Sequence, residues 1–315
     1  MKTCNILFLG GAKRVSLANH FIKAGKKTGL DVHIFSYELD KRVPIASVGE
    51  VLIGKKWKDT DLIDDLCKII IENNINIILP FVDPAVEKCG ILKEKLPKVF
   101  IPSCDVNLCY VMFDKRESEK WFMDHDIPLP MSYHAGDKFD YPIIIKPRTG
   151  SASKGIVVIS NDEEWHDVAN KDNFVIQQYI VNHKEYSVDC YVNQKGKIIS
   201  IVPRERLAVA GGEVVNSITV DDKDLVEVSK KILANKGFYG PVTIQFIKDV
   251  DNGYTYVMEI NPRLGGGVVT SIGAGANITE FILTEYEGHI LEPCTTWKPG
   301  IYMARYFNEV IFSCN

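Results

Sequence analysis

The stretch 256–267 of this chain reads YVMEINPRLGGG, and its alternating apolar residues predict a β-strand. Successive side chains of a strand point to opposite faces, so Glu259, Asn261 and Arg263, at i, i+2 and i+4, share one face. A carboxylate and an amide oxygen side by side form a hard, oxygen-rich site suited to Mg²⁺ that carries nucleotide phosphates. The stretch therefore predicts a metal site at the end of a strand.

A second stretch, IIIKPRTGSASKGIVVI at residues 143–159, places a lysine where an apolar strand ends. A charge there is costly without a partner, so we expect Lys146 to meet the negative charge of a ligand. The loop that follows is built of small residues and carries Lys154, and such a backbone can fold over phosphates. Together the two stretches indicate chemistry on Mg-ATP.

The first hundred residues alternate strands and helices, which predicts a parallel, doubly wound sheet. Expected strands cover 4–9, 32–37, 75–80 and 99–101, and expected helices cover 14–27, 61–73 and 84–96. A small α+β unit follows, with helices at 115–125 and from 162, and strands at 142–146, 155–159 and 174–180. A second sheet is expected from strands at 185–192, 198–202, 213–220, 242–248 and 254–260, with a helix over 222–236. The apolar run 302–312 fits either a strand on the core or an interface.

Two turns of the first unit bear on ligand binding. The first strand runs into GGAKRV at residues 10–15, which lacks the second and third glycines of a dinucleotide-binding turn and so disfavours an NAD-linked dehydrogenase. The segment PFVDPAVE at 80–87 follows a parallel strand, where ligands tend to bind. Asp83 and Glu87 are therefore candidate substrate contacts, with helix capping by Asp83 as the alternative.

The composition argues against a nucleic-acid-binding protein and against a membrane protein. The chain has 315 residues, a formal net charge of −4 and no long basic run, so nucleic acid is not an expected partner. We find no apolar run long enough for a membrane span or a signal segment. The eight cysteines are scattered without a C-x-x-C pair, which favours reduced, buried thiols in a cytoplasmic protein.

The order of these elements and motifs resembles the ATP-grasp superfamily, and within it one ATP-grasp unit of carbamoyl phosphate synthetase large subunits. The resemblance covers about residues 110–290. It implies an N-terminal Rossmann-like domain (1–108), an ATP-grasp lid subdomain with a phosphate loop (109–180) and a C-terminal ATP-grasp subdomain with the metal site (181–315). The fold class is therefore expected to be α/β and α+β.

The resemblance also implies roles for the residues around the nucleotide. Lys115 matches a lysine on the α-phosphate, Lys146 one that bridges α- and β-phosphates, and Lys154 one that stabilises charge on the transferring phosphoryl group. The phosphate loop would bind through Ser151, Ser153 and Gly155. Adenine would be held near Gln178, Tyr179 and Ile180, and the ribose hydroxyls by Glu185.

For the metal, the resemblance implies one or two Mg²⁺ ions, or Mn²⁺ in their place, on Glu259, Asn261 and Gln245. Many relatives have an acid where this chain has Gln245, and a neutral amide oxygen should hold a second ion more weakly. Carbamoyl phosphate synthetases share this glutamine. Arg263 matches the arginine that faces the γ-phosphate or an acyl phosphate.

The sequence gives a weaker indication of which residues bind the acceptor substrate. The glycines of Leu264–Gly267, among them Gly265 and Gly266, offer backbone N–H groups for a carboxylate, and Arg204 or Arg206 is suited to clamp a carboxylate or phosphate. A solvated charged loop fits the two arginines equally well.

The resulting hypothesis is an ATP-dependent carboxylate–amine ligase, stand-alone and acting through an acyl phosphate on small carboxylate and amine substrates. The alternatives are an ATP-grasp small-molecule kinase and a non-catalytic nucleotide-binding accessory protein. A homodimer is compatible with the sequence, which does not determine the assembly.

Overall fold

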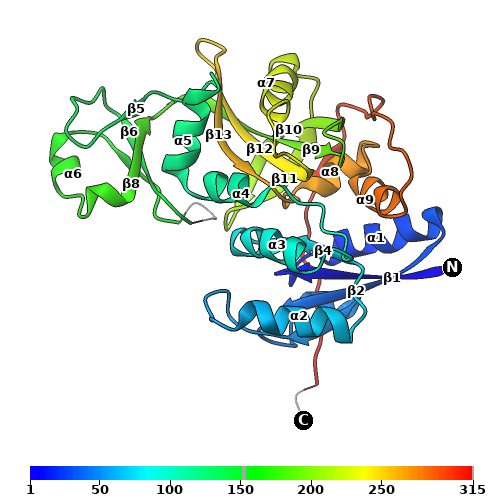
Figure 1. Cartoon of the computed structure of the whole chain (residues 1–315). Coiled ribbons are helices and arrows are strands. Elements are labelled where there is room, and N and C mark those ends of the chain that lie inside the picture. Colours follow the sequence, from blue (N-terminus) through cyan, green and yellow to red (C-terminus); the bar gives the residue numbers. More distant parts are fainter. Residues whose placement is uncertain (151–153, 314–315) are drawn as a thin grey trace.

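The computed structural model describes residues 1–150 and 154–313. Its three sheets occupy separate regions of the molecule in Figure 1, with the parallel sheet below, a small sheet at the upper left and the largest sheet at the upper centre. Helices and strands together give a mixed α/β architecture, as the sequence predicts.

The N-terminal unit is a parallel sheet with the strand order β3-β2-β1-β4. Its helices pack against the sheet because each has an apolar stripe, for example Leu17, Ala18 and Phe21 on α1. In chain order its elements are β1 (Lys2–Leu9), α1 (Val15–Thr28), β2 (Leu30–Glu38), the 3₁₀ turn η1 (Pro44–Ser47), β3 (Glu50–Ile53), α2 (Leu62–Glu72), β4 (Ile77–Pro80) and α3 (Asp83–Lys95).

A small antiparallel sheet, β5-β8-β6-β7, forms the next unit, which we call the lid. Its own small core contains Phe139, Ile143, Ile145, Ile159 and Ile176. The elements that lead into it and build it are α4 (Val106–Phe113), α5 (Lys115–Asp124), β5 (Ser132–Tyr133), β6 (Ile143–Pro147), β7 (Val157–Ile159), α6 (Asp162–His166), η2 (Lys171–Asn173) and β8 (Phe174–Gln178).

The largest sheet has the order β13-β12-β9-β10-β11-β14 and is antiparallel. One of its faces packs on α7, whose buried stripe is Leu225, Ser229, Ile232 and Leu233. The elements are β9 (His183–Val192), β10 (Ile198–Ala210), β11 (Glu213–Thr219), α7 (Lys223–Leu233), β12 (Gly240–Asp249), β13 (Thr255–Asn261), α8 (Val268–Gly273), α9 (Ile278–Tyr286) and β14 (Tyr302–Ala304).

Several elements differ from the sequence predictions. The expected strand at 99–101 is reduced to one parallel bridge between Phe100 and Ile77. The run 302–312 is a strand only over Tyr302–Ala304, and Phe307 beyond it is 98% exposed. The sequence did not predict β3, α4, α8 or α9. In α4 the reason is a continuous apolar run, VNLCYVMF, which has no helical period to detect.

Two further predictions concern the cysteines and membrane spans. Seven of the eight cysteines are free thiols, five of them buried, and Cys314 lies outside the described residues. Burial raises the pKa of Cys4 to about 12, so this thiol is unreactive at neutral pH. Within the described residues, no helix is long and apolar enough to cross a membrane.

Candidate active site

A cavity of about 420 Å³ lies between the lid and the largest sheet. The N-terminal turn of α3 contributes Asp83 to its wall. The cavity gathers twelve of the residues that the sequence marks as site residues: Asp83, Lys115, Lys146, Lys154, Gln178, Tyr179, Ile180, Glu185, Arg206, Gln245, Glu259 and Arg263.

Two lysines reach this cavity from the lid side. Lys146 is the fourth residue of β6, and its Nζ donates to Gln177 Oε1 on β8 at 2.9 Å. Lys115 opens α5, and its Nζ donates to the backbone oxygen of Gly150 at 3.1 Å. A helix N-terminus favours anions, so Lys115 adds a full charge where the backbone already attracts phosphate.

The surroundings of Lys146 change the pKa of its ammonium group. Its side chain is almost fully buried, and this burial lowers its pKa to about 8. Glu259 opposes that shift, whereas the nearby charge of Lys115 adds to it. A desolvated ammonium without a carboxylate hydrogen-bonded to it gains more than a solvated one when phosphate arrives.

The oxygen-rich edge of the site lies on β13 and β12. Asn261 Nδ2 donates to Glu259 Oε1 at 2.9 Å, and Arg263 Nη2 donates to Asn261 Oδ1 at 3.1 Å. Gln245 is the register partner of Glu259 on the neighbouring strand. The side chains of Glu259, Asn261 and Arg263 are thus joined by hydrogen bonds, although β13 ends at Asn261 and Arg263 lies in the bend that follows it.

This donor set fits Mg²⁺. Glu259 supplies a carboxylate, Asn261 and Gln245 supply neutral amide oxygens, and phosphates would complete an octahedron of hard ligands. The described residues contain no group of three or more His, Cys, Asp or Glu side chains that forms a metal cage on its own. An ion here would therefore depend on a bound nucleotide for most of its ligands.

Arg263 connects this edge to the N-terminal unit. Its Nε donates to Asp83 Oδ1 at 2.8 Å, and its Nη2 lies 2.7 Å from the same oxygen. Helix α3 begins at Asp83, with Val82 as its N-cap residue and no side-chain cap hydrogen bond. The carboxylate of Asp83 therefore does not cap the helix, and it binds Arg263 instead.

The other predicted acceptor residues occupy different environments. Arg206 lines the cavity and donates to Glu185 Oε2 at 3.0 Å. Arg204 is 1% exposed and paired with Asp189 at 2.8 Å. Gly265 and Gly266 lie outside the wall of this cavity. Gly265 packs closely, because a Cβ there would lie 2.7 Å from Thr243 Oγ1, whereas a Cβ on Gly266 would be 3.5 Å from Arg14 Nη1.

Sequence reasoning missed two arginines near Gly266. Arg14, from the first turn of the parallel sheet, and Arg305, just after β14, both bind Glu213 Oε2 at 3.1 Å. Burial lowers the pKa of Arg14, Glu213 opposes that shift, and the charges of Arg263 and Arg305 lower it further. No local motif marks these residues, since they come from opposite ends of the chain.

It also missed the apolar wall of the cavity. The wall is formed by strand residues and contains Ile144, Val158, Phe246, Ile247 and Met258. Met258 has no pairing partner on β12, because Gln245 pairs with Glu259 and Phe246 pairs with Val257. Such a β-bulge redirects a side chain, and nothing in the sequence signals it.

Three predicted phosphate-loop residues remain. Ser151 and Ser153 lie outside the described residues. Gly155 has φ +75°, and a Cβ there would lie 3.0 Å from Pro147 Cγ, so its backbone requires glycine.

Comparison with known proteins agrees with this geometry. Residues 112–267 match the ATP-grasp domain family. The chain is 23% identical over 210 residues to the mitochondrial methylcrotonoyl-CoA carboxylase subunit alpha of Oryza sativa subsp. japonica, covering 57% of this chain and 28% of that protein. It is 25% identical over 145 residues to the carbamoyl phosphate synthase large chain of Bifidobacterium adolescentis, covering 41% of this chain and 13% of that one.

A solved structure extends the likeness of the fold. The N5-carboxyaminoimidazole synthetase of Staphylococcus aureus superimposes with a TM-score of 0.72 at 19% identity, covering 92% of this chain and 79% of that one. The likeness therefore includes the N-terminal parallel sheet as well as the matched segment. The chain spans less than a third of the length of the two curated relatives named above.

Proposed function

We propose that this chain, whose residues 112–267 match the ATP-grasp domain family, is an ATP-dependent carboxylate–amine ligase that forms an amide through an acyl phosphate. One observation carries the proposal. A single cavity is lined by three lysines, two arginines and the side-chain oxygens of Glu259 and Gln245, and Asn261 is hydrogen-bonded to Glu259 beside it. This set neutralises a triphosphate and stabilises charge on a transferring phosphoryl group.

The roles follow from position. Lys115 and Lys146 lie on the lid side of the cavity and would bind the α- and β-phosphates, while the apolar wall with Tyr179 and Ile180 would hold the adenine. Glu185 would accept hydrogen bonds from the ribose hydroxyls, which would replace its present hydrogen bond from Arg206. Arg263 and Lys154 would face the γ-phosphate. One or two Mg²⁺ ions, held by Glu259, Asn261 and Gln245, would supply Lewis-acid stabilisation of the phosphate charge.

The reaction has two balanced steps. A carboxylate oxygen attacks the γ-phosphorus, the bond to the β-phosphate oxygen breaks, and ADP leaves with the electron pair. An amine then attacks the acyl carbon, the C–O bond to phosphate breaks, and inorganic phosphate leaves as the amide nitrogen loses its proton. The protein contributes mainly orientation and charge, which is the usual source of rate in phosphoryl transfer.

The carboxylate substrate would bind on the arginine side of the site. Arg14, Arg263 and Arg305 lie close enough for their charges to interact, and the carboxylates Glu213 and Asp83 pair with them. A further carboxylate there would gain charge-assisted hydrogen bonds. The backbone oxygen of Gly266 lies beside these arginines and accepts a hydrogen bond from Arg305 Nη2 at 2.6 Å.

The test is ADP release from Mg-ATP with a panel of small carboxylates, with and without hydroxylamine. Carboxylate-dependent ADP release with hydroxamate formation is the expected result, and Glu259→Gln should lower it by at least a hundredfold. Chelation of the metal should abolish it. A phosphorylated product without hydroxamate would identify a kinase, and ATP binding without turnover would identify an accessory protein. A cytoplasmic location and a homodimer stay predictions.

A further inference from the structure

A second cavity of about 330 Å³ adjoins the first one, between α3, α4 and the end of β13. The two share Asp83, Lys115, Thr149, Gly150 and Glu259, so the second cavity opens onto the part of the site that holds Glu259 and Asp83, the partner of Arg263. Its volume lies in the range of about 300–1,000 Å³ that small-molecule sites occupy. It is large enough for a second substrate.

Most of the residues that line the second cavity but not the first are apolar. Helix α3 contributes Pro84 and Val86, and α4 contributes Tyr110, Met112 and Phe113. Tyr110 is 48% exposed and Phe113 39% exposed, although α4 is otherwise an apolar helix packed on β13 and α3. Large apolar side chains that face a cavity next to polar groups favour a ligand with an apolar body.

The charged groups of this cavity are mainly acidic. Its lining includes four carboxylates, and Lys115 is the one cation among its described lining residues. Two of the carboxylates lie on α3: Glu87 Oε1 accepts from Tyr110 Oη and from Lys88 Nζ, each at 2.9 Å, and Asp83 pairs with Arg263. The other two are Asp114, which pairs with Arg148, and Glu259. Three of these carboxylates already have a cationic partner, but their oxygens can still accept hydrogen bonds from an ammonium group, which a carboxylate ligand cannot donate.

We infer that this second cavity binds the amine substrate, and that this substrate is a primary amine attached to a branched or aromatic apolar group. The inference rests on the proposed ligase function. The ammonium would lie between Asp83 and Glu87, and the apolar group would contact Val86, Met112 and Phe113. The two substrates would thus be bound by different groups, the carboxylate by the arginines and the amine by Asp83 and Glu87.

The same placement serves the second chemical step. The amine must lose one proton before it attacks and another as the amide forms. When Arg263 turns toward the γ-phosphate, Asp83 loses its cationic partner and becomes able to accept a proton from the bound ammonium. The nitrogen lone pair then forms the C–N bond, phosphate leaves with the electrons of the C–O bond, and the second proton of the nitrogen passes to the departing phosphate.

Four probes test the inference by calorimetric titration of the protein saturated with Mg-ADP. L-Leucinamide has the ammonium and the apolar group, glycinamide lacks the apolar group, N-acetyl-L-leucinamide lacks the ammonium, and 4-methylpentanoate carries a carboxylate instead. We expect leucinamide to bind at least tenfold more tightly than each of the others. Equal or tighter binding of any of the other three would overturn the inference.

Variants locate the binding. Phe113→Ala and Glu87→Gln should each weaken leucinamide binding about tenfold, with ADP affinity changed less than twofold. The matched control is Met123→Ala, because Met123 is an apolar residue of α5 that is 53% exposed and lies outside both cavities. The affinity of Met123→Ala for leucinamide should stay within twofold of the affinity of the parent protein. Unchanged affinity in both Phe113→Ala and Glu87→Gln would place leucinamide elsewhere.

The outcome separates this inference from the proposed function. If hydroxamate forms from a carboxylate but leucinamide is neither bound nor accepted, the ligase proposal stands and the amine assignment fails. If leucinamide binds as expected but no carboxylate yields ADP, the cavity assignment stands as a binding site and the ligase proposal fails.

Discussion

At the scale of single residues, the site combines strong charges with little solvent. Lys146 illustrates this, because its ammonium is buried against the neutral Gln177 rather than against a carboxylate. Gln177 is itself fixed by a hydrogen bond from its Nε2 to Glu119 Oε1 at 2.9 Å. The lysine is therefore oriented before any nucleotide binds, and its charge is easily lost.

This arrangement makes ATP use depend on pH. Burial lowers the pKa of Lys146 to about 8, so its cation is present below that pH and is lost as the pH rises through it. The neutral amine binds phosphate poorly, so kcat/KM for ATP should fall about tenfold per pH unit above 8. In Lys146→Arg the guanidinium stays protonated, and kcat/KM should be lower but constant from pH 7 to 9.5. A parent protein whose kcat/KM is flat to pH 9.5 would contradict the assignment.

A second residue-scale prediction concerns the buried pair behind the glycine run. Asp189 accepts from Arg204 Nε at 2.8 Å and from Ser271 Oγ at 2.7 Å, and both charged side chains are 1% exposed. Asp189→Asn leaves the arginine charge uncompensated, so the free energy of unfolding should drop by about 3–5 kcal/mol in urea titrations. Glu227→Gln breaks the exposed pair with Lys230 and should change it by less than about 1 kcal/mol. A loss below about 1 kcal/mol in Asp189→Asn would show that water reaches the pair.

At the scale of elements, Gly267, which precedes α8, packs tightly against residues of β10 and β11. A Cβ on Gly267 would lie 2.5 Å from Arg204 Nη1 and 2.7 Å from Val214 Cγ1. Gly267→Ala should therefore lower the free energy of unfolding by about 1–3 kcal/mol. Gly273, in the same helix, has Ile301 Cγ2 as its nearest neighbour at 3.7 Å, so Gly273→Ala should be neutral or stabilise by up to about 1 kcal/mol. Thermal unfolding of the two variants distinguishes close packing from a general intolerance of side chains in α8.

The same elements show what the sequence could and could not predict. Strands with clear alternation, such as β12 and β13, and the lysine at the end of β6 were found because side-chain period and local charge are visible in the sequence. Helix α8 was not, since GGG followed by β-branched residues does not indicate a helix. Nor were the bulge at Met258 and the meeting of Arg14 with Arg305 at Glu213, because both depend on strand pairing between distant segments.

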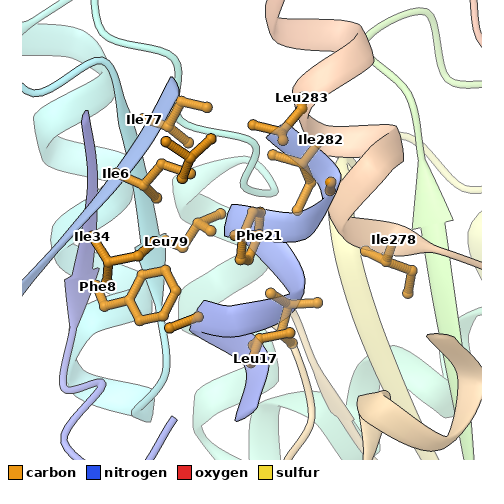
Figure 2. Packing of buried hydrophobic residues seen from close by; sticks show 14 of the residues in the cluster. Ile6, Phe8, Leu17, Phe21, Ile34, Ile77, Leu79, Ile278, Ile282 and Leu283 are labelled. Atoms are coloured by element: carbon orange, nitrogen blue, oxygen red, sulfur yellow. The ribbon is translucent and has the colours of Figure 1, made fainter. Parts of the chain in front are cut away.

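At the scale of the whole molecule, the N-terminal sheet and the C-terminal helices share one core. Figure 2 shows Leu17 and Phe21 of α1 between strand residues such as Phe8 and Leu79 on one side and Ile278 and Ile282 on the other. The boundaries predicted at residues 108 and 180 stay predictions, but this core joins segments from both ends of the chain. The lid, in contrast, has a separate and much smaller core.

This difference predicts how the molecule unfolds. Ile282 is fully buried in the shared core, so Ile282→Ala should lower the free energy of unfolding by about 2–5 kcal/mol. Because the core is continuous, amides of β1 and of α9 should lose protection against hydrogen exchange together in this variant. Amides of β6 and β8 in the lid should exchange faster than both in the parent protein and change little in Ile282→Ala. If instead β1 kept its protection while α9 lost it, the two ends of the chain would be separate folding units. Arg14 would then be held near Arg263 and Arg305 only by surface contacts, and the arginine side of the site would not be preformed.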